Sequence, residues 1–406
     1  MGGTKAGRRA QVEARPRDLA SARCIGHGMN VVLSRTLLVL LPLLASCATT
    51  RTVTLGSTRA PVEPATVPLR MVAGVPFVPV RVAGSPRLHW FLLDTGATTC
   101  VVTPELAGPS ARRLRVHDLQ LPGMGDEAVL LPSVALADAD GHATFEGVFA
   151  MLNPLTRLSE SVGFDVDGVL GFALFRDTTL TIDFQRALLH LAPEPLTMGA
   201  GVVPMRLERG RLPYVELRLG PRSMWALMDT GNSGRFDVPG DVAWASPPTV
   251  VGETSSIDGA PLDRRGRLRE DVLLAGVRFE RPVASLGDAP VVGSGTLSAF
   301  TVSFDQRSRL ARLVPSGGAS GSLEPQRSFG FSLAFRNGRW VISSVLEGSV
   351  AAREGLRPGE RVVRLQGLPA SADVLQVLEH VADELVLELE QRSAAVRLPR
   401  RALVPE

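Results

Sequence analysis

Apolar and polar positions alternate along many short stretches of this chain, which is the pattern of half-buried β-strands. The clearest cases are residues 76–82 and 213–219, each of which ends in an apolar–Arg–apolar sequence. Residues 181–184 and 301–304 have the same strand-like character. The 40 glycines and 30 prolines among 406 residues indicate frequent turns rather than long helices. We therefore predict a mainly β protein.

The middle of the chain contains an internal repeat, which organises the prediction. The matching segments are Val67–Met71 with Val203–Leu207, Pro76–Val78 with Pro213–Val215, Trp90–Gly96 with Trp225–Gly231, and Val169–Gly171 with Val291–Gly293. In each copy a closing proline, Pro193 or Pro315, follows the last glycine by 22 residues. The pattern predicts two copies of one β-rich unit.

The amino terminus has the composition of a targeting signal. A short apolar run follows Arg35 and is too short to span a bilayer as a helix. Its ending, Leu44–Cys47, resembles the lipobox of bacterial lipoproteins, which implies that Cys47 carries a lipid and becomes the first residue of the mature protein. A plain secretory signal is the alternative, and Met29 is a plausible true start.

The charge distribution argues against a nucleic-acid partner. Residues 1–28 carry six Lys and Arg and two Asp and Glu, so the rest of the chain has a net charge of −1 within the total of +3. Three cysteines are too few for a disulfide framework, and we find no Cys-x-x-Cys or His-Glu-x-x-His sequence. We expect no metal site and no cofactor.

Two Asp-Thr-Gly sequences carry the candidate chemistry. Each follows an apolar strand that begins with a Trp, and each lies at the same point of the repeat, at Asp94–Gly96 and Asp229–Gly231. Glycine allows the backbone to turn or to approach a neighbour closely. A single such aspartate is most simply a turn cap. A symmetric pair instead indicates two carboxyl groups with a shared function.

These motifs, Asp94–Thr98 and Asp229–Ser233, resemble those of the aspartic proteases, and the first resembles especially the retropepsin-like branch. The resemblance covers residues 67–315. It implies a bilobal β fold in which Asp94 and Asp229 face each other across a pseudo-dyad, and in which the motif threonines lock the two loops together. The residues that it implies around the two aspartates are Thr95, Gly96, Thr98, Thr230, Gly231, Ser233, Gly171 and Gly293.

Two carboxyl groups about 3 Å apart cannot both ionise, so such a pair shares one proton. The charged member can act as general base toward a water molecule, while the protonated member polarises the scissile carbonyl. This chemistry needs neither a metal nor a covalent intermediate.

Two features depart from pepsin-like enzymes. The only tyrosine, Tyr214, lies before the second motif, so it cannot be the flap tyrosine of those enzymes. The flap candidates are instead Gly123, Met124 and Gly125, which form either a glycine-rich flap or an ordinary hairpin turn. Asn232 stands where small residues are usual.

A different class of protease is a remote alternative. The sequence Gly231–Gly234 resembles the Gly-Asn-Ser-Gly of trypsin-like serine proteases. A triad needs a histidine base held by a carboxylate. Neither His89 nor His117 has the surroundings of that family's histidine, and the repeat already explains the segment.

The carboxy-terminal region is identified as a PDZ domain. Residues 344–362 resemble the core of bacterial PDZ domains, and Phe329, Gly330, Phe331 and Ser332 resemble their carboxylate-binding loop. The resemblance implies that this loop holds the C-terminus of a protein or peptide, which adds a strand to the sheet. Leu375, Val377 and Leu378 would then line the groove from a helix. A PDZ-shaped spacer that binds nothing is the alternative.

The expected organisation is a mainly β, bilobal, single-chain aspartic-protease fold followed by a small α+β PDZ domain. The predicted parts are 1–46 (extension and signal peptide), 47–66 (tether), 67–193 (first lobe), 194–315 (second lobe), 316–328 (linker) and 329–406 (PDZ domain). We expect a lipid-anchored, extracytoplasmic endopeptidase that cleaves extended polypeptides and recruits protein C-termini. An inactive peptide-binding scaffold is the alternative from another class.

Overall fold

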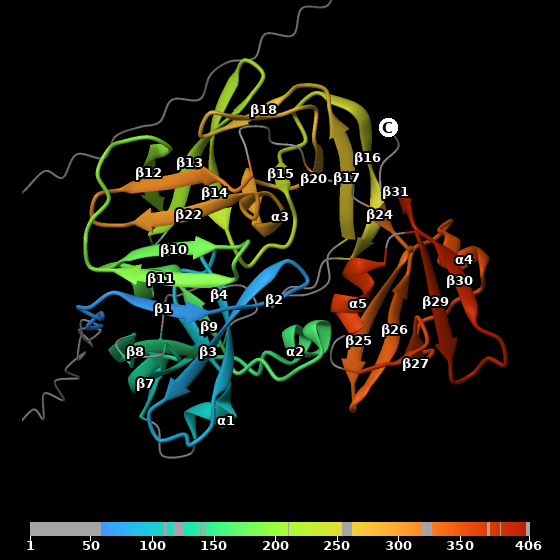
Figure 1. Ribbon diagram of the computed structural model, residues 1–406, viewed down its shortest axis with the longest axis horizontal. Helices are drawn as coiled ribbons and strands as arrows, with labels where there is room; N and C mark the ends of the chain where they lie inside the picture. The colour runs from blue at the N-terminus through green and yellow to red at the C-terminus, as the bar shows by residue number, and fades with distance from the viewer. Residues whose placement is uncertain are drawn as a thin grey trace, which may run out of the picture. The chain divides into compact units, whose positions relative to one another are not determined.

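The computed structural model describes residues 58–108, 112–116, 125–138, 140–141, 143–209, 211–253, 262–317, 323, 327–371, 374–381 and 383–402. The predicted signal peptide, Cys47 and most of the predicted tether lie outside these residues. The described chain is mainly β, as expected, and its strands form several sheets (Figure 1).

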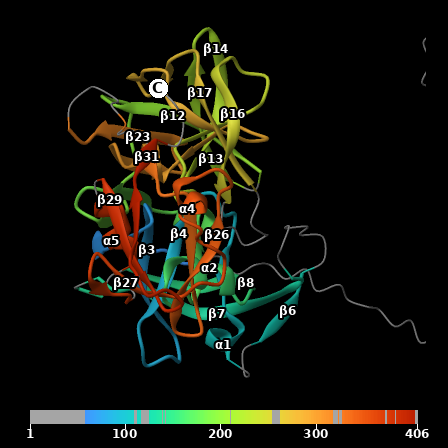
Figure 2. The same ribbon diagram turned by 90° about the vertical axis from the view of Figure 1, so that its right-hand side faces the viewer.

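The first repeat unit builds an eight-stranded sheet in the order β2-β3-β4-β9-β5-β8-β7-β6. Its elements are β2 (Arg70–Val72), β3 (Val75–Val82), β4 (His89–Asp94), β5 (Cys100–Val102), α1 (Pro104–Ala107), β6 (Arg113–Arg115), β7 (Glu127–Leu136), β8 (Thr144–Leu152), α2 (Thr156–Val162), β9 (Gly168–Gly171) and the 3-10 helix η1 (Phe172–Phe175). Strand β3 pairs with β7 as well as with β4, so six of the strands close into a ring. Figure 2 shows β6 at the outer end of β7.

The second repeat unit uses the same strand order. The elements are β12 (Val202–Glu208), β13 (Leu212–Leu219), β14 (Arg222–Asp229), β15 (Phe236–Val238), β16 (Trp244–Glu253), β17 (Leu262–Leu268), β18 (Val272–Leu274), β19 (Val277–Phe279), β20 (Val283–Leu286), β21 (Val291–Gly293) and α3 (Ser294–Leu297). The path β12-β13-β14-β21-β15-β20-β17-β16 matches β2-β3-β4-β9-β5-β8-β7-β6 strand for strand. The internal repeat of the sequence is therefore a repeat of topology.

Strands from both units join in one sheet between them. They run in the order β1-β11-β10-β22-β23-β12, where β1 is Ala65–Pro68, β10 Thr179–Asp183, β11 Leu188–Ala192, β22 Phe300–Asp305 and β23 Leu310–Pro315. At its centre, β10 and β22 are antiparallel, with Thr181 opposite Ser303 and Asp183 opposite Thr301. Thr181 and Thr301 are equivalent in the repeat, so a pseudo-twofold axis passes between these two strands.

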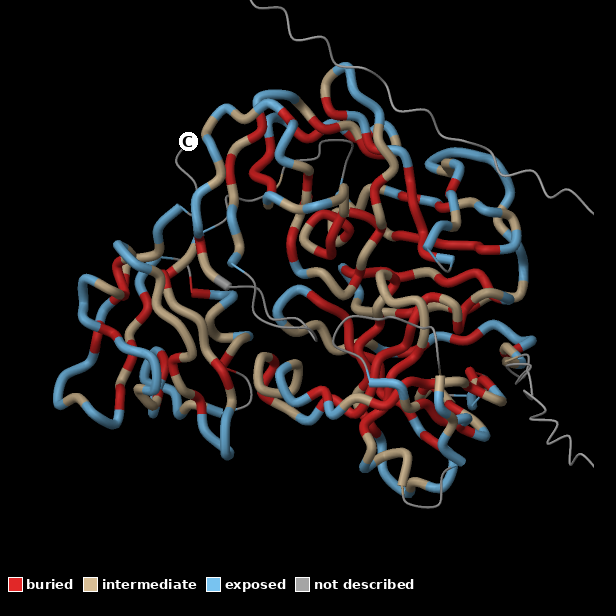
Figure 3. The backbone as a smooth tube through the Cα atoms, turned by 180° about the vertical axis from the view of Figure 1, so that it is seen from behind, coloured by how far each residue is buried: buried red, intermediate tan, exposed pale blue. Residues whose placement is uncertain are grey.

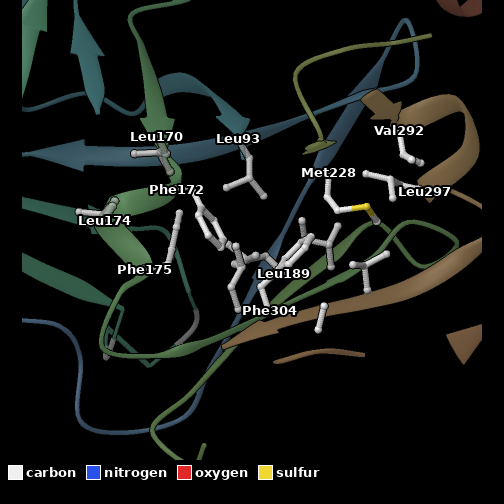
Figure 4. Close-up of a cluster of buried hydrophobic side chains, with 14 of the residues drawn as sticks. Leu93, Leu170, Phe172, Leu174, Phe175, Leu189, Met228, Val292, Leu297 and Phe304 are labelled. Carbon is white, nitrogen blue, oxygen red and sulfur yellow. The ribbon is translucent and has the colours of Figure 1, made fainter. Parts of the chain in front are cut away.

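Side-chain packing repeats along with the backbone. Arg70 lies 5.7 Å from the centroid of the Trp90 ring, and its repeat equivalent, Arg206, lies 3.9 Å from that of Trp225. The main apolar core runs through both units (Figure 3). Leu93 and Met228, which precede the two motif aspartates, belong to it, and Phe172 meets Phe304 edge-on at 5.5 Å (Figure 4).

The carboxy-terminal region has a separate apolar core centred on Trp340, Ile342 and Leu387. Its elements are β24 (Arg327–Ser328), β25 (Phe331–Arg336), β26 (Arg339–Val345), α4 (Val350–Arg353), β27 (Val362–Leu365), β28 (Leu368–Pro369), α5 (Val374–His380), β29 (Glu384–Leu389), β30 (Val396–Pro399) and β31 (Arg401–Ala402). They form a four-stranded sheet, β28-β27-β29-β30, and the pairs β25–β26 and β24–β31.

Two predicted boundaries differ from the structure. The tether was expected to continue to residue 66, but Ala65 and Thr66 belong to β1 and pair with β11, because burial of Ala65 and Val67 favours the sheet over a solvated chain. The linker was expected to continue to residue 328, but its last two residues, Arg327 and Ser328, pair with β31.

The stability of the sheet between the units should depend on Asp305. Its buried carboxylate accepts hydrogen bonds from Arg307 Nε at 2.8 Å and from Leu196 N at 3.0 Å. Burial alone raises the pKa of Asp305, but the hydrogen bonds from Arg307, Ser308 and Leu196 lower it below its ordinary value. We expect Asp305→Asn to lower the free energy of unfolding by about 3 kcal/mol at pH 7. Urea unfolding measures this.

The loss of unfolding free energy in Asp305→Asn should become smaller as the pH falls, because protonation then neutralises the same carboxylate in the parent. Asp177→Asn, which breaks an exposed pair with Arg176, should cost less than about 1 kcal/mol. Equal losses for the two variants would contradict the role of Asp305.

Candidate functional site

The two motif aspartates end equivalent strands. Asp94 is the last residue of β4 and Asp229 the last residue of β14. Each pairs in parallel with a strand that ends in glycine, so that Asp94 lies opposite Gly171 and Asp229 opposite Gly293. The apolar residues of β4 and β14 anchor both strands in the core. The carboxyl groups therefore sit where two buried strands turn.

The motif threonines bind the two turns to each other. Thr95 N donates to Thr230 Oγ1 and Thr230 N donates to Thr95 Oγ1, both at 3.0 Å. Each hydroxyl then donates across to the other unit, Thr95 to the carbonyl of Met228 at 2.6 Å and Thr230 to that of Leu93 at 2.7 Å. Both threonines are fully buried. These four reciprocal bonds fix the two aspartates relative to one another.

The two carboxyl groups lie close enough for each to affect the ionisation of the other, and the backbone of each turn holds its own carboxylate. Asp94 Oδ1 accepts from Gly96 N at 2.8 Å, and Asp229 Oδ1 accepts from Gly231 N at 2.9 Å and from Asn232 N at 3.1 Å. These backbone donors replace part of the hydration that each carboxylate would have in water.

The two motif glycines leave room for the opposite aspartate. A Cβ atom at Gly96 would lie 2.5 Å from Asp229 Cγ, and a Cβ at Gly231 would lie 2.6 Å from Asp94 Cγ. The sequence indicated that the backbone passes close to something at these glycines, but it could not identify the partner. Each glycine is required by the carboxyl group of the other unit.

Burial raises the pKa values of both carboxyl groups. Burial is the largest cause for each, and hydrogen bonds from Gly96 oppose it at Asp94. The pKa of Asp229 is raised well above its ordinary value by burial and then by the charge of Asp94. The two groups therefore share a proton over a wide pH range, as two carboxyl groups at this separation must.

Gly171 and Gly293, the last residues of β9 and β21, lie against the backbone of the turns that follow the two aspartates. A Cβ at Gly171 would lie 2.4 Å from the carbonyl oxygen of Thr99, and one at Gly293 would lie 2.3 Å from that of Gly234. The sequence analysis missed Ser294. Its buried hydroxyl donates to the carbonyl of Thr230 at 2.6 Å, and the signal for it was its place directly after Gly293.

Thr98 and Ser233 do not join the pair. Thr98 is half-buried and Ser233 is exposed, and among the described residues neither side chain hydrogen-bonds to Asp94 or Asp229. His89, considered as a serine-protease base, is buried with its Nε2 2.6 Å from Ser85 Oγ and its Nδ1 3.1 Å from Asp167 Oδ2. Its Nε2 is therefore engaged by Ser85, and its Nδ1 lies within ion-pair distance of Asp167 without forming a hydrogen bond.

The flap candidates cannot be placed, because Gly123 and Met124 lie outside the described residues. Gly125 is described and is exposed, two residues before β7. Cys100 is a buried residue of β5, and burial raises the pKa of its thiol to about 11. It is thus a structural residue of the strand rather than a reactive thiol.

The four residues of the expected PDZ loop follow β24 and continue into β25. Phe329 is buried, Gly330 has φ +84°, and Phe331 and Ser332 begin β25. A Cβ at Gly330 would lie 2.2 Å from Cβ of Ser349, so the loop requires glycine there. Leu375, Val377 and Leu378 lie on α5 and pack against the core of this region.

The described part of the chain lacks two further features, a metal-holding group of side chains and a membrane-spanning helix. It contains no group of His, Cys, Asp or Glu side chains arranged to hold a metal ion. No described helix is both long enough and apolar enough to cross a membrane.

Comparison with known proteins identifies no family. No protein-family model matches the chain, and no curated protein matches it. Among solved structures, basic 7S globulin from soybean is similar, with 12% sequence identity over 66% of this chain and 100% of that chain and a TM-score of 0.43. A similarity at this level identifies neither a family nor an activity, so the candidate site rests on its own geometry.

The close approach at the motif glycines can be tested by adding a methyl group. We expect Gly96→Ala to push the carboxyl groups apart and to lower the free energy of unfolding by about 2 kcal/mol, as overpacking of a close contact does. Gly199→Ala is the matched control, because a Cβ there meets no atom within 4 Å. Equal unfolding free energies in urea for the two variants would contradict the contact.

The raised pKa values predict how stability depends on pH. A carboxyl group whose pKa is higher in the folded than in the unfolded protein stabilises the fold at low pH, and this contribution is lost as the pH rises through the folded pKa. We therefore expect the parent to lose stability through Asp229 as the pH rises above the ordinary pKa of an aspartate and through its raised pKa in the folded protein, and Asp229→Asn to lose less. Urea unfolding at several pH values measures the difference. The exposed Asp241→Asn should keep the slope of the parent, and a parental slope in Asp229→Asn would refute the effect.

Proposed function

We propose that this chain is an aspartic endopeptidase of two retropepsin-like lobes with a carboxy-terminal PDZ domain. The observation that carries the proposal is the pair formed by Asp94 and Asp229, held at equivalent strand ends by reciprocal threonine bonds. A turn-capping role would explain one aspartate. It would not explain why two half-buried carboxyl groups, whose ionisation costs stability, lie beside each other.

The proposed reaction is hydrolysis of a peptide bond by water. The charged carboxylate of the pair removes a proton from a water molecule, and the water oxygen attacks the carbonyl carbon. The protonated carboxyl group donates a hydrogen bond to the carbonyl oxygen, where negative charge develops. The tetrahedral intermediate then collapses as the amide nitrogen accepts a proton and the C–N bond breaks. Backbone donors at Gly96, Gly231 and Asn232 keep the carboxyl groups oriented throughout.

The proposed substrate is an extended polypeptide, which would lie between the two lobes across the pair of aspartates. The PDZ domain would recruit protein C-termini through Phe329–Ser332, and a lipid on Cys47 would anchor the enzyme outside the cytoplasm. The alternative is a lipid-anchored scaffold that binds peptides without cleaving them. The presence of both aspartates favours the enzyme over the scaffold.

The decisive experiment is cleavage of a peptide library by residues 48–406 between pH 3 and pH 8. We expect Asp94→Asn and Asp229→Asn each to lower the rate at least about 10³-fold, because each removes one half of the acid–base pair. The exposed Asp241→Asn should cleave like the parent. Mass spectrometry of the products gives the cleavage preference.

Two results would contradict the proposal. Cleavage that survives in both dyad variants would show that another site or a contaminant is responsible. A folded parent that cleaves nothing at any pH would favour the scaffold, and the measurement would then move to binding of peptides with free and amidated C-termini.

A further inference from the structure

The turn that carries Asp229 is tied to a second carboxyl group. Asn232 donates through its backbone N–H to Asp229 Oδ1 at 3.1 Å, and its side-chain Nδ2 donates to Asp237 Oδ2 at 2.9 Å. Its side-chain Oδ1 accepts from Gly234 N at 2.7 Å. Asn232 therefore connects Asp237 on β15 directly to the turn of the second motif.

The first unit has no counterpart of this connection. Ala97 occupies the place of Asn232 in the first motif. Val101 lies opposite Val169 in β9, as Asp237 lies opposite the equivalent Val291 in β21. Val101 is buried in an apolar cluster. Because the same backbone accepts Ala and Val there, the fold itself does not require an Asn–Asp pair.

Several charged groups face Asp237. They are Asp229 on β14 and, on β17, Asp263 and Arg265. The adjacent strands β20 and β21 place the uncharged residues Ser285 and Val291 opposite Asp237. Arg265 is engaged by Asp263, with Nη2 2.6 Å from Oδ2, so it only partly offsets the charge of Asp237. Burial raises the pKa of Asp237 to about 6, although the hydrogen bond from Asn232 lowers it, so Asp237 carries its negative charge above about pH 6, at the basic end of the activity profile.

We propose that Asp237 is a positioning residue of the dyad, which holds the Asp229 turn through Asn232 and whose negative charge keeps the shared proton on Asp229 rather than on Asp94. This inference rests on the proposed function. A negative charge near one member of a coupled pair disfavours ionisation of that member. Asp229 has such a neighbour, whereas the corresponding position beside Asp94 is Val101. The asymmetry would select Asp94 as the base and Asp229 as the acid.

Two substitutions separate the position of Asp237 from its charge. Asp237→Asn keeps an oxygen acceptor for Asn232 but removes the charge. We expect it to move the basic limb of the pH profile of kcat/KM down by about 0.5 to 1 pH unit, because Asp229 then loses its proton more easily, with kcat at the optimum changed less than about threefold. Asp237→Val also removes the acceptor and should lower kcat at least about tenfold by releasing the turn.

The matched control is Asp183→Asn. Asp183, the last residue of β10, is buried and accepts a hydrogen bond from Arg186 in the turn that follows. It should leave the pH profile unchanged even if it lowers stability. A basic limb in Asp237→Asn that coincides with those of the parent and of Asp183→Asn would overturn the proposal.

A readout without substrate keeps the inference separate from the proposed function. In protein labelled with ¹³C at the Asp carboxyl carbons, the Asp94 and Asp229 signals are assigned by their loss in the two Asn variants. We expect Asp229 to titrate at the higher pH in the parent, and its midpoint to fall by about 0.5 to 1 pH unit in Asp237→Asn. An unmoved midpoint, or a proton carried by Asp94, would refute the inference. If the parent cleaves no peptide, the proposed function fails, but this titration still decides whether Asp237 directs the shared proton.

Discussion

The close approach of two half-buried carboxyl groups is the constraint on which the rest of the structure depends. Burial raises the pKa of both Asp94 and Asp229, and the charge of Asp94 raises that of Asp229 further, so the pair costs folding free energy wherever one member must be charged. The surroundings offset this cost with backbone N–H donors, with glycines that leave space, and with threonines whose bonds cross between the units. Each of these features makes sense only if the pair itself is required.

The pseudo-twofold arrangement explains how one chain can hold such a pair. Each repeat unit supplies a single aspartate at the end of a strand, and neither unit can place its own carboxyl group beside a second one. The pairing of β10 with β22 has a register that is unchanged by exchange of the two units. This register places the two motif strands in equivalent positions. The threonine bonds then hold the two aspartates close to each other.

Much of the fold and of the candidate site could be predicted from the sequence, because local sequence patterns indicate it. The alternation of apolar residues, the repeat and the doubled Asp-Thr-Gly predicted β4, β14 and their aspartates. The partner of Gly96 was not predictable, because a contact with Asp229 across 133 residues leaves no local signal. The strand at Ala65–Pro68 was missed for a related reason: a short alternating segment after a Pro- and Thr-rich stretch reads as tether until its partner β11 is known. Thr98 and Ser233 were assigned by resemblance alone, and among the described residues neither side chain hydrogen-bonds to Asp94 or Asp229.

The symmetry of the backbone makes the asymmetry of the side chains informative. A mechanism that uses one carboxyl group as base and the other as acid cannot be fully symmetric, since the two groups must hold different protonation states at the same pH. Behind Asp94 the structure has an apolar cluster that includes Val101 and Val169; behind Asp229 it has Asn232 and Asp237. Equivalent strands thus place the two carboxyl groups. Under the proposal, different neighbours give the two groups different pKa values. Position is determined by what the two halves share, and chemical role by the few residues in which they differ.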